Sequence, residues 1–107
     1  MGANSPADIK ASLALFQKDF QLDQSYLSLD SQETFTYEQA YLKIMRVVGD
    51  LLERDFNTLL NVLYRIDVSE EQLKKALAAS NDNPAAVITD MILKRELQKV
   101  ETRRKYS

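Results

Sequence analysis

Two charged residues stand where the helical pattern calls for apolar side chains, and they are the strongest candidates for a polar site. Asp55 falls inside an apolar arc that extends over 37–66, and Arg95 falls at the centre of an apolar face, one turn beyond Met91 and Ile92. A carboxylate in such an arc must be paired, protonated or placed in a wet cleft. Because the two charges are opposite, we expect Asp55 and Arg95 to meet as a buried polar pair with a structural role.

A second group of charges lies at the C-terminal end of the chain. Residues 94–107 contain six basic and two acidic residues, whereas the first 93 residues contain 8 basic and 14 acidic ones. The basic residues that form a candidate contact patch are Lys99, Arg103, Arg104 and Lys105. Such cations are typical of a solvated helix end, where they interact favourably with the helix dipole. The functional alternative is weak, salt-sensitive contact with nucleic-acid phosphates or with an acidic partner.

The residue types that the chain lacks argue against several kinds of site. The 107 residues include no Cys, no His and no Trp, which removes disulfides, thiol chemistry, His-based catalysis and the usual zinc sites. The segment 80–83 is rich in oxygen ligands, but Pro84 follows where a calcium-binding loop would continue. We therefore predict a protein that is not an enzyme, with no cofactor, no metal and no small-molecule substrate.

The arc that contains Asp55 belongs to the longest predicted element, one amphipathic helix over 37–66. Thr36 and Gln39 form a capping box at its start, and its apolar residues recur at helical spacing. Thirty helical residues span about 45 Å, whereas a domain of this length is roughly 30–35 Å across. The helix therefore either bends or extends beyond its own globule, where a homodimer would cover the overhanging apolar stripe.

Gly49 interrupts this helix without shifting the phase of the apolar arc. We favour one helix that continues through Gly49, with or without a bend, and another helix packed closely against the glycine. The alternative is that one helix ends at Gly49 and a second is capped by Asp50.

Shorter helices are predicted on both sides of the long one. Capping residues and prolines place them at about 6–20, 70–79 and 84–103. The segment 21–35 is predicted to be a short helix or an ordered loop. The fold class is thus all-α: a small bundle of four helices, or five, around the central helix at about 37–66. We expect a disordered N-terminus at 1–5, one helical domain at 6–103 and a basic tail at 104–107.

Composition and hydropathy limit the location and the function. The chain is 45% hydrophobic and 28% charged, it has no apolar run long enough to span a membrane, and it shows no signal peptide. These features predict a cytoplasmic protein. The leading functional hypothesis is a non-enzymatic protein–protein interaction or self-association module. The alternative is a weak nucleic-acid-associated accessory protein that uses the basic C-terminal tail.

Three segments of the sequence are similar to a known group of proteins. They are Leu63-Tyr64-Arg65-Ile66-Asp67-Val68-Ser69-Glu70, then Asn83-Pro84-Ala85-Ala86-Val87-Ile88, and finally Glu96-Leu97-Gln98-Lys99-Val100. Over roughly 40–107 the chain resembles a family of small bacterial all-helical proteins of uncharacterised function. The resemblance implies a soluble bacterial protein and supplies no catalytic residues.

Overall fold

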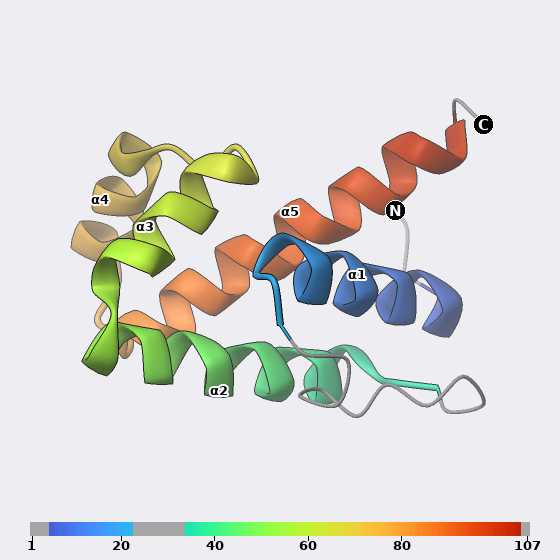
Figure 1. Ribbon diagram of the computed structural model, residues 1–107, viewed down its shortest axis with the longest axis horizontal. Helices are drawn as coiled ribbons and strands as arrows, with labels where there is room; N and C mark the ends of the chain where they lie inside the picture. The colour runs from blue at the N-terminus through green and yellow to red at the C-terminus, as the bar shows by residue number, and fades with distance from the viewer. Residues whose placement is uncertain (1–4, 23–33, 106–107) are drawn as a thin grey trace.

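The computed structural model describes residues 5–22 and 34–105, and these residues form five α-helices (Figure 1). The helices are α1 (Pro6–Asp19), α2 (Tyr37–Arg54), α3 (Phe56–Arg65), α4 (Glu70–Ala79) and α5 (Pro84–Lys105). No strand occurs in these two ranges, which confirms the all-α prediction. The radius of gyration is 13.5 Å and the extents are 36 × 31 × 23 Å, as expected for a single compact domain of this length.

The predicted helix starts are present with their capping hydrogen bonds. Ser5 Oγ accepts a hydrogen bond from the Asp8 backbone amide at 3.1 Å, and Pro6 occupies the first turn of α1. Reciprocal capping boxes join Thr36 to Gln39 before α2, and Ser69 to Gln72 before α4. These bonds satisfy amide groups that have no partner inside the helix, so three of the five helix starts follow directly from local sequence.

The long helix predicted over 37–66 is wrong as a single element, because the chain turns at Asp55. This residue ends α2 and caps α3, with φ −153° and ψ 70°. Figure 1 shows α3 rising from the end of α2 instead of continuing along its axis. The break lets 28 of the 30 residues remain in two packed helices within a domain whose greatest extent is 36 Å. No 45 Å helix projects from the domain, so the overhang that favoured a homodimer does not exist.

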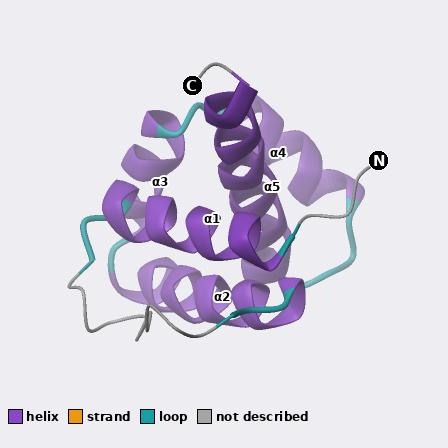
Figure 2. Cartoon of the chain, turned by 90° about the vertical axis from the view of Figure 1, so that its right-hand side faces the viewer, coloured by secondary structure: helices purple, strands orange, loops and turns teal. Residues whose placement is uncertain are grey.

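The central position belongs to α5, which packs against α1, α2 and α4. In Figure 2 α1 and α2 lie parallel, one above the other, and in Figure 1 α5 runs across them in the opposite direction. The core between them contains these fully buried side chains: Leu13, Phe16, Ile44, Val48, Ile88, Ile92 and Leu93. Leu59, Leu63 and Ile66 close the same core from α3 and its C-terminal end.

Gly49 lies inside α2 and has no close neighbour in the described part of the chain. A Cβ atom added at Gly49 would meet nothing within 4 Å, and its backbone φ is not positive. The expected close approach of another helix is therefore wrong, and so is the alternative helix end at Gly49, since α2 continues to Arg54. Neither packing inside the domain nor backbone geometry requires a glycine here.

One predicted boundary, at the C-terminal end of the last helix, is wrong, and two other predictions fall largely outside the described residues. Helix α5 extends to Lys105, so Arg104 and Lys105 belong to the helix and not to a separate tail. The predicted disorder at 1–5 falls almost wholly outside the described residues, as do most of 21–35. Among the helices that the structure describes, none is both long and apolar enough to cross a membrane.

Replacing Gly49 by Ala is expected to stabilise the domain by about 1 kcal/mol, because alanine restricts the unfolded chain and meets no clash in α2. For a domain of this size the melting temperature should rise by about 4–8 °C. Thermal unfolding followed by circular dichroism, at low protein concentration, measures the change. Ala14→Gly, at an exposed position inside α1, is the matched control and should lower stability by a similar amount. An unchanged or lower melting temperature for Gly49→Ala would show that the glycine is needed within the monomer.

Candidate functional site

Asp55 is exposed and acts as a helix cap, so its predicted place in a buried pair with Arg95 is wrong. Its Oδ1 accepts a hydrogen bond from the Thr58 amide at 3.2 Å, and its Oδ2 accepts one from Thr58 Oγ1 at 2.6 Å. These two bonds hold the pKa of Asp55 below its usual value. Asp55 interrupted the apolar arc because it ends one helix and starts the next, where a carboxylate is favoured.

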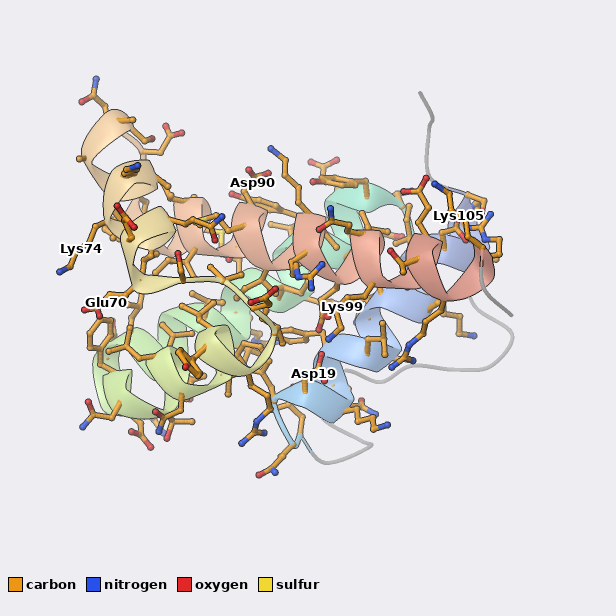
Figure 3. The ribbon with its side chains drawn as sticks, turned by 90° about the horizontal axis from the view of Figure 1, so that it is seen from above. Asp19, Glu70, Lys74, Asp90, Lys99 and Lys105 are labelled. Carbon is orange, nitrogen blue, oxygen red and sulfur yellow. The ribbon has the colours of Figure 1, made fainter. Side chains whose placement is uncertain are left out.

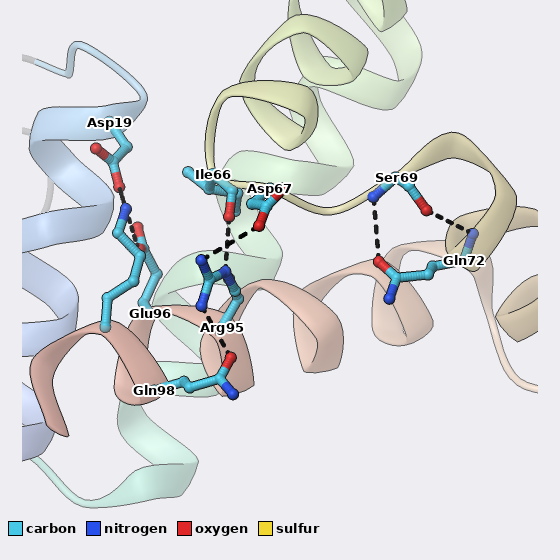
Figure 4. A network of polar contacts seen from close by, with 9 residues as sticks. Asp19, Ile66, Asp67, Ser69, Gln72, Arg95, Glu96 and Gln98 are labelled. Atoms are coloured by element: carbon cyan, nitrogen blue, oxygen red, sulfur yellow. Dashed lines mark hydrogen bonds and ion pairs between the residues drawn. The ribbon is translucent and has the colours of Figure 1, made fainter. Parts of the chain in front are cut away.

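Arg95 is half-buried, and it closes the C-terminal end of α3. Its Nε donates to the carbonyl oxygen of Ile66 at 2.8 Å, and its Nη1 donates to Gln98 Oε1 at 2.9 Å. Its Nη2 lies 3.6 Å from Asp67 Oδ2 (Figure 4). Helix ends leave carbonyl groups without partners, and Asp67 adopts a left-handed φ of 73° directly after this end. Arg95 therefore fixes the chain between α3 and α4 instead of meeting Asp55.

A surface groove of about 870 Å³ runs beside Arg95, between α5 and the chain that links α3 to α4. Tyr37 from the start of α2 also borders it. Burial and the charge of Asp90 raise the pKa of Tyr37 above its usual value. The charged side chains that line the groove are of both signs: Lys94 and Arg95 are basic, and Asp67 and Glu101 are acidic. This mixture gives no preference for an anion or a cation.

The candidate basic patch is divided by internal ion pairs. Lys99 Nζ lies 2.7 Å from Asp19 Oδ2, and the Lys99 side chain is only 22% exposed. Arg104 pairs with Asp8 near the start of α1, and this contact holds the pKa of Asp8 below its usual value. Arg103 and Lys105 are exposed on the last turn of α5. Two of the four predicted cations thus attach α1 to α5, which leaves a smaller basic surface than the sequence suggested.

The most deeply buried polar cluster consists of Asp19, Glu96 and Lys99, which join the end of α1 to α5 (Figure 3). The Glu96 side chain is 0% exposed, and Lys99 Nζ lies 3.2 Å from its Oε1. Within the described residues neither carboxyl oxygen of Glu96 accepts a hydrogen bond of good geometry. The ammonium group of Lys99 thus contacts carboxyl oxygens of both Asp19 and Glu96, which Figure 4 shows close together.

The surroundings of Glu96 favour its protonated form. Burial, and then the neighbouring Asp19 carboxylate, raise the pKa of Glu96 to about 8, although Lys99 acts in the opposite direction. Burial lowers the pKa of Lys99, but hydrogen bonding to Asp19 and the Glu96 carboxyl outweigh it and raise the value. At neutral pH the cluster therefore combines a neutral Glu96 with a charged Lys99. It holds two helices together, and the groove beside Arg95 does not open onto it.

A sequence signal for Glu96 was available, because it lies one helical turn beyond Ile92 and Leu93. Both of these residues are 0% exposed, and a residue three or four positions later shares their face. Its partner Asp19 is 77 positions away in the sequence, and no local pattern links the two. The cluster was missed because Lys99 was assigned to a solvated patch.

A separate feature is the exposed apolar surface on α2. Leu42 is 58% exposed, and the partly buried Met45 and Leu52 lie on the same side of the helix as Gly49. Phe56, at the corner where α3 begins, is 47% exposed. The open space above Gly49 adjoins this row. We call Leu42, Met45, Gly49 and Leu52 the α2 face.

Comparison with protein-family models, with curated proteins and with solved structures found no match for this chain. In the two described ranges, no group of three or more Asp or Glu side chains is arranged to hold a metal ion. The resemblance to small bacterial helical proteins therefore remains a prediction from sequence.

Replacing Asp55 by Ala is expected to cost about 0.5–2 kcal/mol in the free energy of unfolding, because the cap of α3 is lost. Asp55→Asn, which keeps an acceptor oxygen, should cost less. In a double-mutant cycle with Arg95→Met, measured by urea unfolding, the coupling energy should stay within about 0.5 kcal/mol. A coupling of about 2 kcal/mol would instead support a direct Asp55–Arg95 pair.

Replacing Glu96 by Gln is expected to flatten the dependence of stability on pH. The pKa of Glu96 is about 8 in the folded protein and near the ordinary 4.5 in the unfolded chain. Between these values the folded state binds more protons, so the free energy of unfolding falls as pH rises. The slope that Glu96 adds approaches about 1.4 kcal/mol for each pH unit within the window.

Urea unfolding of the native protein and Glu96→Gln at pH 5, 6.5 and 8 tests this pH dependence. The variant should gain stability relative to the native protein as pH rises, since its amide is neutral throughout. Glu101→Gln, at an exposed position of α5, is the control and should follow the native profile. Parallel profiles for the native protein and Glu96→Gln would mean that Glu96 is ionised in the folded state at neutral pH.

Proposed function

We propose that this protein is a non-enzymatic protein–protein interaction module that binds through the α2 face. The observation that carries the proposal is the row of apolar side chains beside Gly49, in which Leu42 is 58% exposed and Met45 and Leu52 are partly buried. Large apolar side chains gathered on one side of a helix, beside a glycine that the domain itself does not need, are typical of a surface that another helix covers. The cost of about 1 kcal/mol for a glycine inside a helix is then offset in the complex.

The nucleic-acid alternative has less support. Electrostatic binding to nucleic acid scales with the number of phosphates that Lys and Arg side chains neutralise. Lys99 and Arg104 are already engaged with carboxylates of α1, so Arg103 and Lys105 contribute most of what remains. A bacterial origin and a cytoplasmic location are retained as proposals that rest on the sequence alone.

Site-specific photocrosslinking in cells tests the interaction. A photoreactive amino acid at Leu42 of the full chain is expected to yield discrete adducts of higher mass. The same amino acid at Lys74, exposed on α4, is the matched control and should yield few. Adducts should decrease when Gly49→Leu is added, because the leucine covers the centre of the α2 face. Equal crosslinking at both positions, or none at Leu42, would contradict the proposed function.

A further inference from the structure

The α2 face has the spacing of a helix-pairing surface. Leu42, Met45, Gly49 and Leu52 are separated by three, four and three residues. At about 100° per residue, all four positions fall within about 80° of one another. This is the narrow stripe that packs against a single partner helix. The side chains that α2 contributes to the domain core lie on another side of the helix: Ala40, Ile44, Val47 and Val48.

The stripe is nearly symmetric about Gly49. Met45 and Leu52 lie four positions before and three positions after the glycine. Leu42 lies seven positions before the glycine and is exposed. If two copies of α2 crossed antiparallel at their glycines, Met45 of each copy would face Leu52 of the other. The absence of a Cβ at the crossing lets the two helix backbones approach closely.

Two opposite charges lie beside the stripe, and they match each other when two copies of α2 are antiparallel. Arg46 and Glu53 lie three positions before and four positions after Gly49, and they share one edge of the stripe, within about 20° of each other. Both are exposed, and neither forms an ion pair with the part of the chain that the structure describes. Asp50 and Arg54, by contrast, pair with each other at 3.1 Å.

An antiparallel two-fold places each edge of the stripe beside the same edge of the other copy. Arg46 then faces Glu53 of the partner subunit, and the symmetry repeats this contact. In a parallel pair, the edge that carries Arg46 and Glu53 would instead face the opposite edge of the other copy's stripe. Val48 lies at that opposite edge and is buried in the domain core. The charges therefore select the antiparallel arrangement and a second copy of this chain as the occupant.

We infer that two copies of this chain associate through the α2 face, antiparallel and crossing at Gly49, with Arg46 of each copy paired to Glu53 of the other. This inference rests on the proposed function, since it names the partner of the same surface. It differs from the homodimer suggested by helix length, because it needs no overhang and uses a different side of α2 from Ala40, Ile44, Val47 and Val48.

Charge reversal with rescue tests the arrangement. Sedimentation velocity over a range of concentrations should show a monomer–dimer equilibrium for the native chain. Arg46→Glu or Glu53→Arg alone should weaken dimerisation by about tenfold or more, through two like-charge contacts in each dimer. The double variant should restore most of the affinity, because both contacts become attractive again. Reversing Glu70 and Lys74, a pair exposed on α4, is the matched control and should leave the equilibrium unchanged.

Gly49→Leu separates the interface from folding. A Cβ at this position meets nothing within 4 Å in the described part of the chain, so the helical content and the cooperative unfolding of the chain should be retained while the dimer is lost. Ala78→Leu, exposed on α4, is the control and should still dimerise. A dimer that survives Gly49→Leu, or one that the double charge reversal does not rescue, would overturn the inference.

The two proposals fail in different ways. The chain could stay monomeric at every concentration while its crosslinks at Leu42 join a different protein. That result would overturn the inferred homodimer but retain the proposed interaction module. A chain that gives no specific crosslinks at Leu42 would overturn both. Crosslinked adducts of twice the chain mass, lost on Gly49→Leu, would support both.

Discussion

The break at Asp55 is the constraint on which the rest of the fold depends. A continuous helix of thirty residues would be about 45 Å long, longer than the greatest extent of the domain, 36 Å. The turn allows α3 to fold back, so that Leu59, Leu63 and Ile66 join the core formed by α1, α2 and α5. Asp55 makes the turn favourable because its carboxylate accepts both hydrogen bonds that Thr58 donates. Without the turn, the apolar side of α3 would have no core to enter.

The packing of helix α5 depends on this turn and on two groups of polar contacts. Arg95 binds the carbonyl of Ile66 just beyond α3, which places the link to α4 against the side of α5. The Asp19, Glu96 and Lys99 cluster attaches α1 to the same helix. The cluster combines a short contact between Lys99 and Asp19 with a buried carboxyl that is more stable when neutral. It therefore provides specificity between helices at the cost of a dependence on pH.

The contrast between the two faces of α2 connects the fold to the proposed function. The core face is fully buried and does not involve Gly49, whereas the α2 face combines an exposed leucine with open space above that glycine. Selection for stability alone would favour alanine at such a position. The basic end of α5 shows the opposite relation, because Lys99 and Arg104 serve the packing of α1 and are less available to a partner. From surface composition alone, the basic end of α5 would have been the expected contact surface.

Local sequence determined the helical class and the capped starts of α1, α2 and α4, because capping boxes and 3.6-residue periodicity act within a few residues. It also identified Asp55 and Arg95 as exceptions to the apolar pattern, but not what each of them does. Only the tertiary structure decided those roles, since a helical projection assumes a continuous axis and Asp55 ends that axis. The pairing of Asp19 with Glu96 and Lys99 likewise depends on α1 and α5 meeting across about 80 residues of chain, which no local pattern encodes.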